Sequence, residues 1–170
     1  MKYLLLSKKT KQLEKHQIIK ICKLKNTHWK YGFKSNIKWF KNNVKSNDTH
    51  NLIYFNSKLI GYTHLKTRSF YYLRKKKYIF FDTLIIDKNF RRRKISYYLM
   101  NLNHEIILNS NKFSFLICTN KLVEYYKKFG WKLMKKKSFS IGDHKFNTNG
   151  MCFNNKVLNN KNKYIFYIHK

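Results

Sequence analysis

The sequence predicts an α/β (α+β) fold: a mixed, mostly antiparallel sheet with about four helices on its two faces. Three observations lead to this prediction. Short apolar runs with strand character alternate along the chain with stretches of helical periodicity. A polar turn joins two of the apolar runs into a hairpin. One run, residues 78–86, is apolar on both faces, which is typical of a central strand covered from both sides.

The first half of the chain is predicted to hold a strand, two helices and the hairpin. Thr10 can cap a helix in which Ile18, Ile19 and Cys22 recur on one face. The residues Asn56-Ser57-Lys58 tolerate turn conformations and separate two apolar runs. The expected elements are, in order, a strand over 3–6, a helix that begins near Thr10, a helix over 37–44, a hairpin over 51–65 whose second strand runs on towards Phe70, and the central strand over 78–86.

The second half continues the alternation of helices and strands. Ile95, Leu99, Leu102 and Ile106 recur at helical spacing, which predicts an amphipathic helix over 95–109. Gly130 can take the left-handed conformation that ends a helix. The expected elements are a strand over 113–118, a helix over 120–129, and strands over 131–139, 150–153 and 164–168, separated by a turn at Gly142-Asp143 and an Asn/Lys-rich segment over 154–163.

Length and composition favour one domain. The chain has 170 residues, of which 43% are hydrophobic and 18% aromatic, and this supports a single core and not two. We therefore expect one domain over residues 1–170, with 153–170 as a basic C-terminal extension that can add a further strand.

The charge and the cysteines limit the class of protein. The net charge is +31, from 38 Lys and Arg against 7 Asp and Glu, and it attracts polyanions and phosphorylated ligands. The chain also has no proline or alanine and many Lys and Asn residues, as an AT-rich genome would produce, so the charge alone does not establish nucleic-acid binding. Cys22, Cys118 and Cys152 form no CxxC pair, so we expect no disulfide framework, no metal site and a cytoplasmic or equivalent reducing compartment. No apolar run is long enough for a signal peptide or a membrane span.

A run of four cations stands between the central strand and the helix that follows it. Arg91, Arg92, Arg93 and Lys94 repel one another at this junction. A strand, a loop and a helix N-terminus together make an anion site, because the first-turn amides have no partner inside the helix and the helix dipole adds about half a positive charge. The alternative is a solvated charge run, which is usual in a protein this basic.

This junction resembles the loop of the GNAT acyltransferase superfamily, (Arg/Gln)-x-x-Gly-x-(Gly/Ala), which holds the pyrophosphate of coenzyme A. The matching residues are Arg91-Arg92-Arg93-Lys94-Ile95-Ser96, with Lys94 in the place of glycine. The segment TNKLVEYYKKFGWK, residues 119–132, is similar to the family's Asn-x-x-Ala-x-x-Phe-Tyr-x-x-x-Gly-Phe segment. Thr119 stands at the usual asparagine position, and the adjacent Asn120 takes the cofactor-binding role if the register of the motif shifts by one residue. The two motifs and the element order cover about residues 1–153.

The resemblance implies a binding site for acetyl-CoA, used as a co-substrate. Amides of Arg92 to Ser96 would hold the pyrophosphate, and the cationic side chains of the loop would supplement them. The resemblance also implies that the central strand splays away from the next strand, 113–118. Amides of Leu84, Ile85 and Ile86 would then pair with the pantetheine arm, which is itself a chain of amides.

The resemblance also implies roles in catalysis. Tyr126 corresponds to the family's tyrosine that protonates the departing thiolate, while its place on an apolar helix face also suits a core residue. Tyr125 points about 100° away and is the weaker choice. Asp82 lies in an otherwise apolar strand and is either structural or the base that takes the proton of the substrate ammonium, with His64 or water as alternatives. Cys118 is interpreted as a core residue.

The sequence therefore predicts an N-acetyltransferase that moves an acetyl group from acetyl-CoA to a primary amine of a small molecule, with a protein amine as the alternative acceptor. Two other functions stay open. One is a basic module that binds nucleic acid or ribosomes, in which Tyr71, Tyr72 and Trp39 would stack on bases. The other is a coenzyme A-binding protein of the same fold without catalysis. We expect no membrane partner and make no prediction of oligomeric state.

Overall fold

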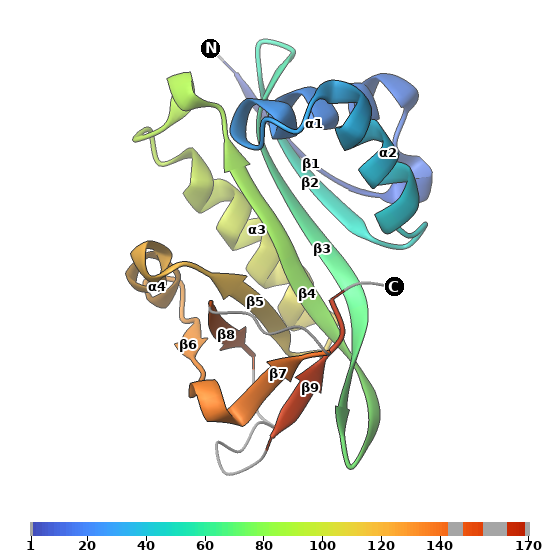
Figure 1. Ribbon diagram of the computed structural model, residues 1–170. Coiled ribbons are helices and arrows are strands. Elements are labelled where there is room, and N and C mark those ends of the chain that lie inside the picture. The colour runs from blue at the N-terminus through green and yellow to red at the C-terminus, as the bar shows by residue number, and fades with distance from the viewer. Residues whose placement is uncertain (1, 143–147, 155–162, 169–170) are drawn as a thin grey trace. The chain divides into compact units, whose positions relative to one another are not determined.

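The structure is a computed structural model, and it describes residues 2–142, 148–154 and 163–168. Contacts within the chain group it into two compact units, which are described separately (Figure 1). Unit 1 comprises Met1–Lys66 and Thr83–His104, and unit 2 comprises Thr67–Asp82 and Glu105–Lys170. Two strands and one helix run from one unit into the other. The expected single domain over 1–170 remains a prediction.

Unit 1 is an antiparallel sheet with helices on both faces. Its strands follow the order β1-β2-β3-β4, and β1 pairs with β2 along its whole length. The elements are β1 (Tyr3–Lys9), α1 (Lys15–His28), α2 (Phe33–Asn43), β2 (Thr49–Phe55), the first part of β3 (Lys58–Tyr72), the last part of β4 (Arg74–Ile86) and most of α3 (Ile95–Asn109), with short 3-10 turns at Thr10–Gln12 and Lys88–Phe90.

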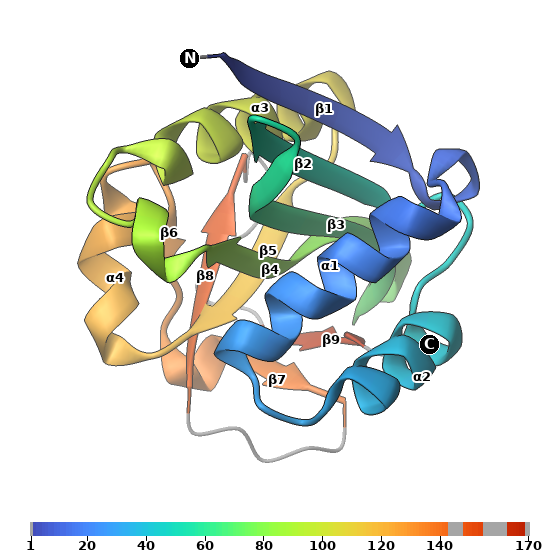
Figure 2. The ribbon, with the colours of Figure 1, turned by 90° about the horizontal axis from the view of Figure 1, so that it is seen from above.

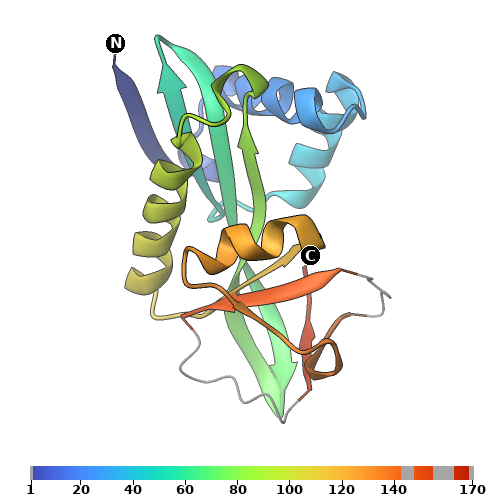
Figure 3. The ribbon, with the colours of Figure 1, turned by 90° about the vertical axis from the view of Figure 1, so that its left-hand side faces the viewer.

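The two faces of the unit 1 sheet have separate apolar cores. Side chains of α1 and α2 pack with Leu52, Tyr62 and Ile85 on one face. On the other face, Ile95 and Leu99 of α3 pack with alternate residues of the same strands. Figures 2 and 3 show α1 and α3 on opposite sides of these strands. This arrangement explains why the final part of β4 is apolar on both faces.

The β2–β3 hairpin contains two features that set which residues meet. Asn56 and Ser57 form its turn with φ values of 44° and 65°, the left-handed conformation that tight hairpin turns require. A register shift follows between Ile53 and Tyr54. Beyond it Gly61 lies opposite Ile53, and a Cβ atom there would stand 2.6 Å from the Ile53 Cγ2 atom, so only glycine fits without displacement.

Unit 2 has a sheet in which β5 lies between β4 and β8, and β8 lies between β5 and β6. Its core is aromatic, with Phe115 and Phe166 stacked at 4.0 Å between ring centroids. The elements are the remaining parts of β3, β4 and α3, then β5 (Ser114–Cys118), α4 (Asn120–Lys127), β6 (Lys132–Leu133), a 3-10 turn at Lys136–Ser138, β7 (Phe139–Ile141), β8 (Asn149–Phe153) and β9 (Tyr164–Phe166).

The predicted fold class is confirmed: a mixed, mostly antiparallel sheet with four α-helices among the described residues. The helix over 95–109 has the predicted bounds, and the hairpin, the strand over 113–118 and the left-handed Gly130 (φ 74°) are present. The remaining strands and helices agree within a few residues, except for the two differences below. Asp143 and most of the Asn/Lys-rich segment lie outside the described residues.

Two element predictions are wrong. Thr10 does not cap α1: it starts a 3-10 turn, and its hydroxyl donates to the carbonyl of Lys45 at 2.6 Å, while Glu14 stands at the N-cap. The single strand over 131–139 is instead a two-residue strand, a 3-10 turn and β7. Trp131 and Met134 are both buried three residues apart, and this spacing does not fit the two-residue period of a strand.

No helix within the described ranges is both long enough and apolar enough to cross a membrane.

Candidate active site

The junction between β4 and α3 has an unusual backbone. Arg92 and Lys94 both take left-handed conformations, with φ values of 63° and 58°. Left-handed residues in a loop turn successive amide groups towards one side and form a concave site for anions. Lys94 stands at the glycine position of the loop motif that this segment resembles. It adopts the left-handed conformation that glycine takes there, at a cost of roughly 1 kcal/mol. The loop thus has a left-handed backbone at this position even though Lys94 carries a side chain.

Contacts within unit 1 hold both ends of this loop in place. The carboxylate of Asp87 accepts from the amide of Asn89 at 3.0 Å and from the ammonium of Lys58 at 2.8 Å. Burial alone would raise the pKa of Asp87, but these hydrogen bonds outweigh it and lower the pKa. The Nε atom of Arg91 donates to the carbonyl of Ile86 at 3.2 Å, closing the loop onto the end of β4.

The four cations of the loop are all exposed, but they differ in what they contact. Arg91 is hydrogen-bonded to the strand, and the guanidinium of Arg93 lies 5.4 Å from the centre of the Phe90 ring. Within the described residues, the backbone amides of Arg92, Arg93 and Lys94 have no acceptor in the protein.

The first turn of α3 completes this site. Ile95 is buried against the sheet and anchors the helix start, whereas Ser96 is only half-buried. The amides of these two residues lie in the first turn of the helix and have no acceptor within it, so they point out of the helix end. Loop amides, the helix dipole and four positive side chains together suit a ligand with two or more negative charges. The residues present therefore fit the diphosphate of coenzyme A.

The residues Leu84, Ile85 and Ile86 form the end of β4 that leads into this loop. Ile85 packs with α1 and α2, while Leu84 and Ile86 pack on the face of α3. In unit 2, the parallel pairing of β4 with β5 consists of Ile79 with Ser114 and Phe80 with Phe115. The pairing of the two strands within unit 2 is therefore short, and the splay of β4 from β5 remains a prediction.

Tyr126 lies in an aromatic cluster of unit 2. Its ring stands 6.1 Å from that of Phe81 on β4 and 6.1 Å from that of Trp131. The side chain is 7% exposed. Burial raises the pKa of Tyr126, and the neighbouring Tyr125 and Cys118 raise it further. The hydroxyl group therefore keeps its proton throughout the neutral range.

Asp82 is the next residue after Phe81 on β4. Burial alternates along this part of the strand, with Phe81, Thr83 and Ile85 buried and Asp82 half-buried. Since successive strand residues point to opposite faces, Asp82 lies on the face away from the Phe81–Tyr126 contact. The structure does not bring the carboxylate and the phenol together on one face of β4.

The other predicted residues of unit 2 have structural contacts. The side-chain oxygen of Asn120, at the start of α4, accepts from the side-chain Nδ2 atom of Asn149 on β8 at 2.6 Å. Cys118 is buried, its sulfur lies 3.7 Å from that of Met151, and burial raises its pKa to about 11. A thiol with so high a pKa is a poor nucleophile, which agrees with its interpretation as a core residue.

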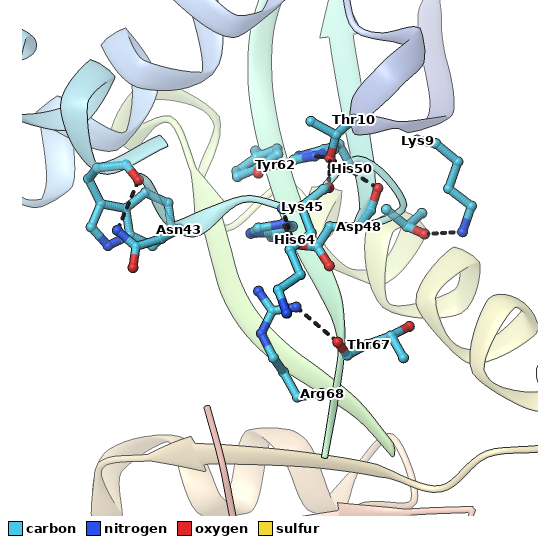
Figure 4. A network of polar contacts seen from close by, with 12 residues as sticks. Lys9, Thr10, Asn43, Lys45, Asp48, His50, Tyr62, His64, Thr67 and Arg68 are labelled. Atoms are coloured by element: carbon cyan, nitrogen blue, oxygen red, sulfur yellow. Dashed lines mark hydrogen bonds and ion pairs between the residues drawn. The ribbon is translucent and has the colours of Figure 1, made fainter. Parts of the chain in front are cut away.

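A buried histidine pair in unit 1 was only half found from the sequence. His64 lies directly opposite His50 across β2 and β3, the rings stack at 4.5 Å, and both side chains are fully buried (Figure 4). His50 contacts the hydroxyl groups of Thr10 and Tyr62, both at 2.8 Å. The Nε2 atom of His64 lies 3.7 Å from the carboxylate of Asp48. The available signal was one histidine in each strand of the hairpin.

The aromatic residues of the nucleic-acid alternative differ in exposure. Tyr71 is 47% exposed, whereas the Tyr72 ring packs against Tyr164 at 5.0 Å. The ammonium of Lys25 lies over the Trp39 ring, 3.3 Å from the ring centre, so this face of the ring is not open to a base.

Comparisons with known proteins agree with this geometry. The family model described as an acetyltransferase (GNAT) domain matches residues 11–142, more than half of the chain. The chain therefore belongs to the GNAT acetyltransferase family, and its class is that of the acetyl-CoA-dependent N-acetyltransferases. None of the curated protein sequences compared with it matches.

Solved structures share the fold at low sequence identity. ElaA of Escherichia coli superposes with a TM-score of 0.67 at 15% identity, over 89% of this chain and 99% of that one. An acyl-CoA N-acyltransferase of Pseudomonas aeruginosa gives 0.67 at 12% identity, over 89% and 99%. An aminoglycoside 6'-N-acetyltransferase in complex with coenzyme A gives 0.62 at 12% identity, over 87% and 96%.

The left-handed backbone of the loop leads to a prediction on stability. Replacing Lys94 by glycine should raise the free energy of unfolding by about 1 kcal/mol, because glycine adopts this conformation without strain. Urea denaturation measures the change. Arg93→Gly is the matched control, since it removes the same charge from the neighbouring position, which is not left-handed, and it should lower stability. Equal losses in both variants would contradict a strained Lys94.

Proposed function

We propose that the chain transfers the acetyl group of acetyl-CoA directly to the primary amine of a small molecule. The observation that carries the proposal is the loop from Arg91 to Ser96, with two left-handed residues, outward amides and a helix N-terminus within the segment that matches the family model. Such a loop binds a diphosphate mainly through its backbone amides, and the cationic side chains that neighbour it supplement them.

The coenzyme supplies an activated thioester, and the chain binds and orients it. Amides of Arg92 to Ser96 hold the diphosphate, and exposed cations of the loop add long-range attraction. Amides of Leu84 to Ile86 pair with the pantetheine arm in the manner of an added strand. The short pairing of β4 with β5 in unit 2 supports this role. The same amides polarise the thioester carbonyl and stabilise the oxyanion that forms on attack.

Two protons must move during transfer. The amine attacks the thioester carbonyl, a C–N bond forms, the C–S bond breaks, and the thiolate leaves. Tyr126 donates its proton to the thiolate, and its raised pKa keeps the phenol protonated until that step. The proton of the attacking amine goes to Asp82 or to water. Because Asp82 points away from the face of Tyr126, the geometry favours a water molecule as the first acceptor.

The acceptor class rests on the relatives. Two solved structures of the same fold are aminoglycoside acetyltransferases, and aminoglycosides are small molecules that carry amines. A protein with a net charge of +31 repels a polycationic acceptor on approach, so we expect an amine that carries few positive charges.

Ligand-dependent stability tests the proposal. Acetyl-CoA at about 100 times its dissociation constant should stabilise the protein by about 2.7 kcal/mol, measured as a thermal shift. Arg92→Glu should remove most of this shift, whereas Lys121→Glu, an equal charge change on exposed α4, should keep it. Thiol release with a panel of small amines then measures turnover. A steep, salt-dependent shift with RNA and none with acetyl-CoA would reverse the assignment in favour of a nucleic-acid-binding module.

A further inference from the structure

Strand β1 is an open edge of the unit 1 sheet. All seven of its residues, Tyr3–Lys9, pair with β2 on one side. On its other side no strand of the described chain pairs with it, as Figure 2 shows. Tyr3, Leu4 and Leu5 are 41%, 51% and 38% exposed. A long apolar edge with unpaired peptide groups is a template on which another extended chain can add a strand.

A basic groove lies along one face of this edge. It has a volume of about 480 Å³ and contains the side chains of Leu4 and Leu6 on β1, with His16, Lys20 and Lys2 around them. This volume lies in the range of sites that take small molecules or a few side chains. The groove is entirely within unit 1 and shares no residue with the anion loop.

The two lysines of the groove, Lys2 and Lys20, have no carboxylate partner among the described residues. Glu14, the nearby carboxylate, is already paired with Lys8 at 3.3 Å and with His16 at 3.2 Å. The ammonium of Lys20 donates to the carbonyl of Ser57 at 3.1 Å, and in the described part of the chain it has no carboxylate partner. An acidic group entering the groove would therefore meet an uncompensated positive charge.

A buried tyrosine also lines the groove. Tyr54 is 8% exposed and lines the cavity, and its hydroxyl makes no hydrogen bond of acceptable geometry with the described residues. Burial raises the pKa of Tyr54, and the side chain of Gln17 nearby lowers it only in part. The Tyr54 hydroxyl therefore keeps its proton at neutral pH and stays a hydrogen-bond donor beside the groove.

The opposite face of the same edge is apolar and aromatic. Tyr3 stacks on Tyr98 of α3 at 6.4 Å between ring centroids and contacts Phe55 at 5.2 Å. Because strand residues alternate, Leu5 lies on this face with Tyr3, while Leu4 and Leu6 lie on the groove face. An added strand would thus meet cations on one face and exposed apolar side chains on the other.

We propose that β1 binds an extended peptide of a partner protein in which acidic and apolar residues alternate. The peptide backbone pairs with the open edge of β1, the acidic side chains enter the groove beside Lys20 and Tyr54, and the apolar side chains cover Tyr3 and Leu5. Pairing of main chains gives affinity, and the alternation gives specificity. This surface is separate from the acyl transfer described above and does not depend on it.

A second copy of this chain fits the edge less well. In an antiparallel pairing of two β1 strands, Lys2 of one copy would approach Lys8 and Lys9 of the other, and like charges placed opposite one another are destabilising. Each copy also carries a net charge of +31. Charge complementarity therefore selects an acidic partner.

Fluorescence anisotropy with labelled peptides tests the proposal on the full chain. A short peptide of alternating glutamate and valine should bind, and binding should weaken at high salt. A peptide of the same composition with its glutamates and valines in two separate blocks should bind about tenfold more weakly, which corresponds to about 1.4 kcal/mol. An alternating peptide with N-methylated central amides should also lose affinity, because it cannot donate to β1.

Two matched variants locate the site. Lys20→Glu should weaken binding of the alternating peptide by about tenfold or more. Lys23→Glu, the same change at an exposed position of α1 outside the groove, should change it less than about twofold. Equal losses in the two variants, or equal binding of the alternating and block peptides, would show attraction by net charge alone and overturn the proposal. Sedimentation that shows self-association abolished by Leu4→Glu would overturn it in favour of a second copy.

Discussion

Replacing Tyr126 by phenylalanine should lower kcat for acetyl transfer by about 100-fold while the affinity for acetyl-CoA stays unchanged. The variant keeps the aromatic contacts with Phe81 and Trp131 and removes only the hydroxyl proton. General acids contribute about 10² to 10⁴ in rate, and the lower value applies because a thiolate is a weak base and leaves readily. Steady-state release of coenzyme A measures kcat, and the acetyl-CoA thermal shift measures binding.

Tyr125→Phe is the control for this prediction. Tyr125 is adjacent on α4 and its ring contacts that of Tyr126 at 5.3 Å, but it is the weaker candidate for the acid. We expect its variant to keep kcat within about threefold, as is usual for changes outside the reacting groups. Full activity of Tyr126→Phe together with a large loss in Tyr125→Phe would assign the acid to Tyr125.

The pH profile gives a second measurement on Tyr126. The pKa of Tyr126 is raised from the ordinary value of a tyrosine, which is about 10. The protonated, acid form of Tyr126 therefore persists at every pH below about 10. Between neutral pH and about pH 9, the wild-type kcat should therefore show no decline that can be assigned to Tyr126. Any decline in this range should appear equally in the Phe variant. A decline with an apparent pKa near neutrality that disappears in Tyr126→Phe would contradict the role.

Acidification should destabilise the fold by about 1.4 kcal/mol per pH unit below pH 6 through His50 alone. Burial, with a smaller contribution from His64, lowers the pKa of His50 to about 2, while an unfolded histidine has a pKa of about 6.5. Between these values the unfolded chain binds a proton that the folded chain does not. Stability is therefore complete above about pH 6.5 and falls as the pH falls.

The groups around His50 set the size of this effect. Asp48 opposes the shift in the pKa of His50, whereas the cations contribute to it. Burial also lowers the pKa of His104, so this second histidine adds to the acid sensitivity of the fold. The charged or titratable groups that face His50 are Asp48, His64, Tyr62, Lys25 and Lys66.

Urea denaturation from pH 7 to pH 4 measures the slope. His50→Asn should be less stable at pH 7, because the contacts with Thr10 and Tyr62 are lost, but its stability should fall less steeply with acid. His28→Asn, at an exposed position of α1, should keep the wild-type slope. An unchanged slope in His50→Asn would show that other groups control the acid sensitivity.

Local patterns predicted most of the elements, because they depend on neighbours in the chain. The periodicity of Ile95, Leu99, Leu102 and Ile106 predicted the bounds of α3, and the polar residues at 56–58 predicted the hairpin turn. The two motifs that resemble the GNAT family identified the family, which the match over 11–142 confirms. The prediction of a single strand over 131–139 was wrong, because the buried residues there do not follow the two-residue period of a strand.

The candidate site was predicted in part. The loop at Arg91 to Ser96 was found because it combines a charge run with a motif, and the structure adds that Lys94 takes the glycine conformation. The roles of Tyr126 and Asp82 remain predictions. The sequence did not indicate that Asp82 and Phe81 divide the two faces of β4, which places the carboxylate away from Tyr126.

By itself the sequence determined the family and most of the order of elements, and it predicted the anion loop, since each depends on residue types at short spacing. Only the tertiary structure decided which residues meet across strands. The turn at Asn56-Ser57 alone would set His50 opposite Thr63, but the register shift at Ile53 and Tyr54 moves it opposite His64. A shift of one residue exchanges the faces of a strand, so one bulge brings two buried histidines together.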